Sequence, residues 1–310
     1  LEKLINDTVG QSLGHFSSEL ALCVTIVGLL LVRLVSLDRW LPTYWVALLG
    51  AIAAFGLAAC QMKQGGATQF LFTGLLVYDQ FGIFFRLFLL LFLVLVIALT
   101  VISGIPDNED GPDFYTLLLG ATIGMMLMVS ANNLLILFLG IEMTSVPSYV
   151  MVGFLKGRKL SSEAALKYVI YGAGIAGVML YGISLMAGML GTTDMSLIAE
   201  RMHLLLSPEA DGADLSVRSN AMLRTVVLAS LLISAGVAFK LSLVPFHFWC
   251  PDAFEGAPAE VAGFLSVASK AAAFALLVRF CLALVGKDSG ALSEHVYLYL
   301  GVGLGVVAAI

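Results

Sequence analysis

The sequence predicts an all-α polytopic membrane protein with about nine transmembrane helices. Of its 310 residues, 60% are hydrophobic and only 12% carry a charge. A soluble domain has roughly 25% charged residues and a far more polar surface than this composition can supply. The apolar residues also gather into stretches of about 20, the length that crosses a bilayer. The bilayer is therefore the expected solvent for most of the chain.

The apolar stretches follow one another along the whole chain. The predicted spans lie near 17–37, 41–61, 81–103, 114–130, 133–155, 164–190, 222–248, 259–285 and 294–310. The first is interpreted as a membrane helix because no small-residue cleavage site follows it. The longest polar connection, 191–221, contains MSLIAERMHLLL, which predicts a short interfacial helix.

Charged residues outside the spans indicate orientation more than function. The net charge is -5, and no basic run indicates nucleic-acid binding. KGRK at 156–159 is the one basic cluster in a short connection. The positive-inside rule places it in the cytoplasm and the N-terminus outside. The four cysteines are scattered without a CxxC or Cys/His cluster, so neither a metal ion nor an iron–sulfur centre is expected.

One string imitates a nucleotide-binding motif. GAGIAG at 172–177 matches the dinucleotide fingerprint GxGxxG, and Asp194 follows about 20 residues later. Its glycines lie inside a long apolar run, however, and not in a strand–turn–helix unit. Small residues at this spacing allow close packing of membrane helices, which is the preferred interpretation.

Two charged residues lie in the middle of apolar spans. Glu142 lies within ILFLGIEMTSVPSYV, and Lys240 lies within LLISAGVAFKLSLVPFHFW. Burying a charge in a bilayer costs at least a few kcal/mol, so such residues usually face inward, find a partner and serve a function. Pro245 predicts a broken helix close to Lys240. Each residue is a candidate for proton transfer, and the alternative for each is a purely structural hydrogen bond.

Three further residues are weaker candidates for proton transfer. Lys270 has small neighbours in SVASKAAAF, and its alternative role is a structural cation paired with a carboxylate. Lys167 lies near the start of its span and could extend to the interface. His247 could relay protons near neutral pH or form a structural hydrogen bond. Asp252 and Glu255 are interpreted as residues that shape the loop or contact a neighbour.

At these residues the chain resembles a known family. The run FKLSLVPFHFWCPDAFEGAPAEVAGFLSVASKAAAFALLVR at 239–279 is similar to the antiporter-like membrane subunits of respiratory complex I, and more narrowly to the subunit N family of bacterial NADH–quinone oxidoreductases. The segments NNLLILFLGIEMTSVPSYVMVGF at 132–154 and EAALKYVIYGAGIAGVMLYGISLMAG at 163–188 resemble the same family.

The resemblance implies a fold and a division of the chain. The family has two inverted five-helix repeats, each with a broken helix, which here is the seventh span. Residues 1–112 correspond to N-terminal membrane helices, 113–285 to the first repeat and 286–310 to the start of a further span. A later lysine of the family lies beyond residue 310, so a partial chain is expected. Glu142, Lys240, Lys167 and Lys270 match the charged residues of the fifth to eighth spans.

The resemblance also implies a function. The chain would translocate protons through a buried Glu/Lys relay driven by redox chemistry in other subunits of complex I. It would hold no cofactor itself, whereas partner subunits would hold flavin and iron–sulfur clusters. Quinone is used by the complex and is not assigned to this chain. A bacterial inner membrane is favoured over the mitochondrial one. The alternatives are a cation/proton antiporter and a structural membrane scaffold.

Overall fold

The structure is a computed structural model that describes residues 8, 10, 12–35, 42–65, 67–106, 110–155, 157–206 and 215–285. Within these ranges, eight helices are long and apolar enough to cross a membrane. They correspond to the first eight predicted spans, and the predicted class of all-α polytopic membrane protein is confirmed. The predicted ninth span, 294–310, lies outside the described residues.

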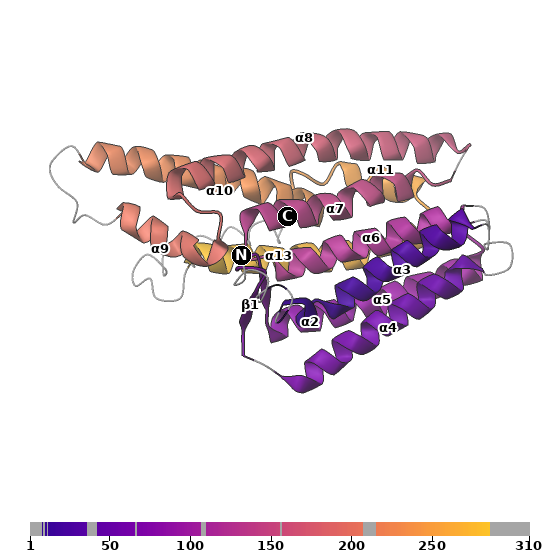
Figure 1. The fold of residues 1–310 in the computed structure, drawn as a ribbon. Coiled ribbons are helices and arrows are strands. Elements are labelled where there is room, and N and C mark those ends of the chain that lie inside the picture. The colour runs from indigo at the N-terminus through magenta and orange to yellow at the C-terminus, as the bar shows by residue number, and fades with distance from the viewer. Residues whose placement is uncertain are drawn as a thin grey trace.

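The elements run mostly lengthwise through the molecule (Figure 1). In chain order they are α2 (Leu13–His15), α3 (Ser17–Leu34), α4 (Thr43–Gln64), β1 (Gln69–Leu71), β2 (Leu76–Tyr78), α5 (Gln80–Ser103), α6 (Gly111–Ser130), α7 (Leu134–Val152), α8 (Lys159–Leu190), α9 (Met195–Leu206), α10 (Leu215–Leu241), α11 (Trp249–Gly256), α12 (Ala259–Phe264), the π-helix η3 (Leu265–Ser269) and α13 (Lys270–Val285). The helix predicted from MSLIAERMHLLL is α9.

Helix α6 lies at the centre and packs closely on α7. A Cβ added to Gly124 would lie 2.7 Å from the Thr144 nitrogen, and one added to Gly140 would lie 2.9 Å from the Met128 nitrogen. Such contacts bring two membrane helices together through van der Waals packing. Helix α7 carries Glu142, so this packing fixes the helix on which the candidate site depends.

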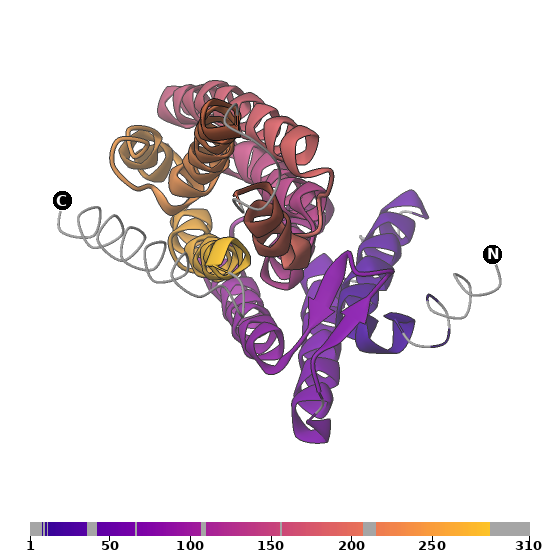
Figure 2. The same ribbon diagram turned by 90° about the vertical axis from the view of Figure 1, so that its left-hand side faces the viewer.

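The first three spans, α3 to α5, form a group beside this core (Figure 2). A small antiparallel hairpin, β1–β2, connects α4 to α5, with Gln69 opposite Tyr78 and Leu71 opposite Leu76. This hairpin was not predicted from the sequence. Asp79 then caps α5, because its Oδ1 accepts a hydrogen bond from the Gly82 nitrogen at 2.8 Å.

A buried ion pair joins this group to α6. Arg86 Nη2 lies 2.9 Å from Glu19 Oε1, and both side chains are at most 1% exposed. Arg86 also donates to the Ser130 hydroxyl at 3.0 Å, and the Ser18 hydroxyl donates to Glu19 at 2.8 Å. The pair therefore connects the starts of α3 and α5 to the last residue of α6.

The GAGIAG string lies in α8, which confirms the helical interpretation. Close packing holds for only one of its glycines. A Cβ on Gly172 would lie 2.0 Å from the Tyr149 hydroxyl of α7, whereas Gly174 and Gly177 have open space at the same position. The helical period explains the difference, because the three glycines point in different directions around the helix.

Candidate functional site

The predicted break after Lys240 is present, and it begins before the proline. Helix α10 ends at Leu241, and Ser242 adopts a left-handed φ of 58°. The Leu243 nitrogen still donates to the Ala238 carbonyl at 2.9 Å, and the Ser242 nitrogen donates to Phe239 at 3.0 Å. The predicted span 222–248 is therefore a helix to residue 241 followed by turns.

The Trp249 side chain of α11 contacts the end of α10 at this break. Its Nε1 donates to the Phe239 carbonyl at 3.1 Å, and this oxygen also accepts from the Ser242 nitrogen. The Trp249 ring stacks on Tyr168 of α8 with 4.3 Å between ring centroids. Tyr168 in turn meets Tyr149 of α7 edge to face at 4.6 Å. These aromatic contacts hold α7, α8 and α11 around the end of α10.

Lys240 is buried at the end of α10, with only 1% of its surface exposed. Its ammonium donates a hydrogen bond to the Ser145 hydroxyl of α7 at 3.1 Å. The Ser145 hydroxyl donates its own hydrogen bond to the Ile141 carbonyl at 2.7 Å, so its oxygen can accept from the lysine. Ser145 was not among the residues predicted from the sequence.

Glu142 is partly buried, three residues before Ser145 on α7. Residues three apart lie on one face of a helix, so Glu142 and Ser145 both face towards Lys240. Glu142 and Lys240 interact electrostatically. No ion pair within 4.0 Å joins these two described side chains, however. The arrangement is a lysine held by a hydroxyl, with a carboxylate further away on the same face.

Lys270 and His247 lie near the site without a direct bond to it. Lys270 is partly buried at the start of α13, with its Nζ 5.6 Å from the centre of the Phe254 ring. His247 lies in the turns after α10, and its Nδ1 is buried without a hydrogen-bond partner among the described residues. In the same ranges, no hydrogen bond or ion pair connects either residue to Lys240.

Lys167 differs from the other lysines because its side chain is 40% exposed. It forms ion pairs with Glu163 at 2.8 Å and with Asp252 of α11 at 2.9 Å. Asp252 therefore contacts a neighbouring helix, one of the two roles expected for it. The ion pairs tie α11 to α8 at the edge of the site.

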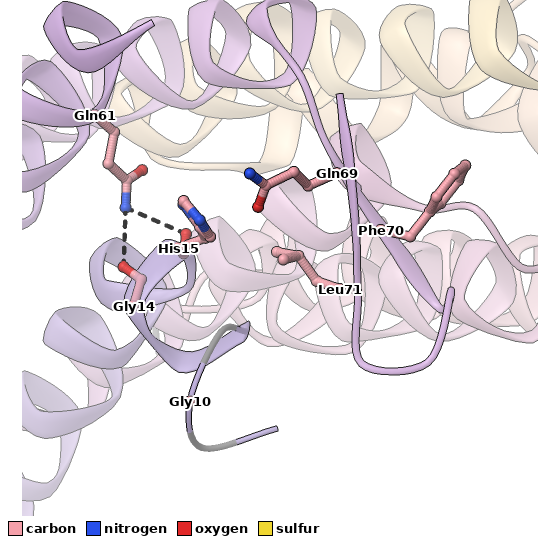
Figure 3. Close-up of a pocket in the computed structure, with 7 residues that line it drawn as sticks. All are labelled: Gly10, Gly14, His15, Gln61, Gln69, Phe70 and Leu71. Atoms are coloured by element: carbon pink, nitrogen blue, oxygen red, sulfur yellow. Dashed lines mark hydrogen bonds between the residues drawn. The ribbon is translucent and has the colours of Figure 1, made fainter. Parts of the chain in front are cut away.

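A pocket of about 690 Å³ lies at the hairpin end, away from these residues. His15, Gln61 and Leu71 are among the residues that line it (Figure 3). The Gln61 amide donates to the His15 carbonyl at 3.2 Å. None of the predicted relay residues lines this pocket, and across the described ranges no group of His, Cys, Asp and Glu is placed to hold a metal ion.

The chain belongs to the NADH:quinone oxidoreductase/Mrp antiporter transmembrane family, whose model matches residues 131–308. One curated relative, NADH-quinone oxidoreductase subunit N 1 of Koribacter versatilis, is 37% identical over 276 residues, which cover 85% of this chain and 52% of that protein. The resemblance to subunit N stated from the sequence is confirmed. The chain spans about half the length of the curated relatives it matches.

Solved structures share the fold. A chain of respiratory complex I from Thermus thermophilus with bound aureothin has a TM-score of 0.65 at 29% identity, over 85% of this chain and 53% of that one. A chain of the Mrp complex from Dietzia sp. has a TM-score of 0.72 at 19% identity, over 96% and 52%. The second likeness concerns the fold alone.

Proposed function

We propose that this chain is part of a proton-translocating membrane subunit of NADH–quinone oxidoreductase in a bacterial inner membrane. Its relatives of 36–41% identity carry the names of quinone oxidoreductase subunits, mostly subunit N. The single observation that carries the proposal is Lys240, almost fully buried at a break in a membrane helix and hydrogen-bonded to Ser145. Burying an ammonium inside a membrane costs free energy, and the residues that carry such a charge usually serve a function.

In the proposed mechanism, Glu142 and Lys240 form a charge switch. When Glu142 is ionised and near, its field stabilises the protonated lysine. Opposite charges 4 Å apart interact by about 4 kcal/mol at an effective dielectric constant of 20. When a neighbouring subunit draws Glu142 away, this stabilisation falls and Lys240 releases its proton. The proton then passes through water to Lys270 and onward.

The break after Leu241 suits this role. Turns expose backbone carbonyls that an unbroken helix would use internally, and these can stabilise water or an ammonium inside a membrane. His247 lies in these turns with a free Nδ1 and is proposed as a further proton carrier. Lys167 is proposed to contribute less, because its ammonium is occupied by Glu163 and Asp252.

The redox cofactors and the remaining proton-translocating elements are proposed to lie in other parts of the complex. Residues 113–285 would form the first antiporter-like repeat, after N-terminal helices at 1–112. Other membrane subunits would be neighbours, and partner subunits would carry flavin and iron–sulfur clusters. Redox energy and quinone chemistry would then act on this chain only through its neighbours.

The proposal is tested with the full-length subunit in the purified complex, reconstituted into vesicles. Proton uptake and NADH oxidation are measured together in the wild type and in Glu142→Ala. The expected result is a severalfold loss of proton uptake in an assembled complex. Full proton uptake would contradict the relay and favour a structural scaffold.

A cation/proton antiporter is a second candidate, favoured by the matching family model, whose description includes Mrp antiporters. The two functions differ in the driving force and the ion. Exchange of sodium for protons across vesicles, without NADH and abolished in Lys240→Ala, would support the antiporter. Proton uptake that depends on NADH and does not change with sodium supports the oxidoreductase.

A further inference from the structure

Arg279 contacts two helices, α5 and α6, at the hairpin end of the molecule. Its Nη1 donates to Asp79 Oδ2 at 3.1 Å and its Nη2 donates to Asp79 Oδ1 at 2.7 Å, so the two side chains form a bidentate ion pair. Its Nε donates to the Val129 carbonyl near the end of α6. The guanidinium carbon also lies 5.3 Å from the centre of the Phe81 ring. A bidentate ion pair fixes the orientation of the guanidinium relative to the carboxylate as well as the distance between them.

Arg279 lies on the same helix as Lys270, nine residues later. At 3.6 residues per turn, nine residues make about 2.5 turns, which puts the two side chains on opposite faces of α13. The contacts agree with this geometry. Arg279 faces α5 and α6, whereas Lys270 lies over Phe254 of α11.

The helix before Lys270 is irregular. The five residues Leu265–Ser269 form a π-helix between α12 and α13. A π-turn adds a residue to the turn and changes the rotation of the helix that follows it. The rotation of α13 relative to α12 therefore differs from that along a continuous α-helix. Apart from Lys270 itself, Arg279 is the only charged side chain on α13, since the others are apolar or cysteine.

We propose that Arg279, held by Asp79, is a positioning residue that sets the rotation of α13 and keeps Lys270 over Phe254. Apolar side chains pack with little directional preference, whereas the bidentate ion pair favours one orientation of the Arg279 side chain. The first three spans thereby help to place Lys270 through the residue that caps α5. The importance of this placement for proton transfer rests on the proposed function.

Two variants break the ion pair from its two sides. Arg279→Gln removes the guanidinium. Asp79→Asn removes the carboxylate charge and keeps the cap on α5, because asparagine caps helices as well as aspartate does. Leu282→Ala, a change to a side chain 56% exposed on the same helix, is the matched control. Arg279→Lys keeps the positive charge that Arg279→Gln removes but cannot form the bidentate pair, so it should restore the position of Lys270 only in part.

Each variant is introduced into the full-length subunit, and the purified complex is studied by electron cryo-microscopy and by proton uptake per NADH oxidised. The expected result for Arg279→Gln and Asp79→Asn is that Lys270 leaves the Phe254 ring and proton uptake falls severalfold, with Leu282→Ala unchanged. If Lys270 stays over Phe254 in both variants, the positioning proposal is wrong. If Lys270 moves and proton uptake is unchanged, positioning stands and the relay role of Lys270 fails. If the complex with Arg279→Gln does not assemble, the position of Lys270 and the proton uptake in Asp79→Asn test the proposal.

Discussion

The Lys240 ammonium donates its hydrogen bond to the Ser145 hydroxyl at 3.1 Å and not to the Glu142 carboxylate. Ser145 and Glu142 lie three residues apart on one face of α7, so both face towards Lys240. The neutral hydroxyl accepts one hydrogen bond from the buried ammonium and leaves its charge unneutralised. The proposed charge switch requires this separation, because in it Glu142 changes its distance from the lysine.

Ser145→Ala is expected to lower proton uptake per NADH. The change leaves a buried ammonium without its acceptor, and an unsatisfied buried polar group costs about 1–3 kcal/mol. Ser148→Ala is the matched control, because the Ser148 hydroxyl donates to the Thr144 carbonyl within the same helix. Proton uptake in vesicles distinguishes the two. Equal losses in both variants would mean that Ser145 only supports the helix.

Gly172→Ala is expected to destabilise the protein. The new methyl group would lie 2.0 Å from the Tyr149 hydroxyl, and overpacking a tight interface typically costs about 1–3 kcal/mol. Gly174→Ala has open space at this position and is expected to be neutral. Thermal unfolding of the two purified variants compares them. A lower melting temperature for Gly174→Ala than for Gly172→Ala would contradict the observed packing of α8 on α7.

Glu19→Gln and Arg86→Met should each impair stability more than the double variant does. Breaking a buried ion pair from one side typically costs about 3–5 kcal/mol, because the remaining charge is left without its partner. Replacing both charges removes that penalty. A double-mutant cycle on unfolding measures the coupling. Simple addition of the two single effects would show that the pair contributes no interaction energy.

Lys167→Ala is expected to reduce proton uptake less than Lys240→Ala. Its side chain is 40% exposed and already paired with Glu163 and Asp252, so solvent and salt weaken its influence on the relay. Vesicle assays at low and high salt measure the effect. A loss equal to that of Lys240→Ala at both salt concentrations would assign Lys167 to the relay itself.

The sequence predicted the first eight spans and the break near Lys240 because both depend on local composition. Long apolar runs define spans, and a proline after a buried lysine indicates an interrupted helix. The position of the break could not be predicted. It depends on Ser242 adopting a left-handed φ and on the Trp249 indole reaching the Phe239 carbonyl, which are tertiary contacts.

Neither the buried Glu19–Arg86 pair nor the ion pair of Arg279 with Asp79 was predicted from the sequence. The charges of Glu19, Arg86 and Arg279 lie towards the ends of apolar stretches, where charged side chains usually extend into water. Their burial comes from the hairpin, from α2 and from the end of α6. Ser145 was missed for another reason, because a serine in a membrane helix usually bonds to its own backbone, and only the approach of α10 reveals its second partner.

Proton uptake per NADH oxidised in Lys240→Ala is the sharpest test of whether the buried lysine carries protons. The assay uses the full-length subunit in the reconstituted complex, with Lys159→Ala, an exposed lysine at the start of α8, as the matched control. The account predicts an assembled complex that oxidises NADH with a severalfold lower proton yield, and an unchanged yield for Lys159→Ala. An unchanged yield for Lys240→Ala would contradict it.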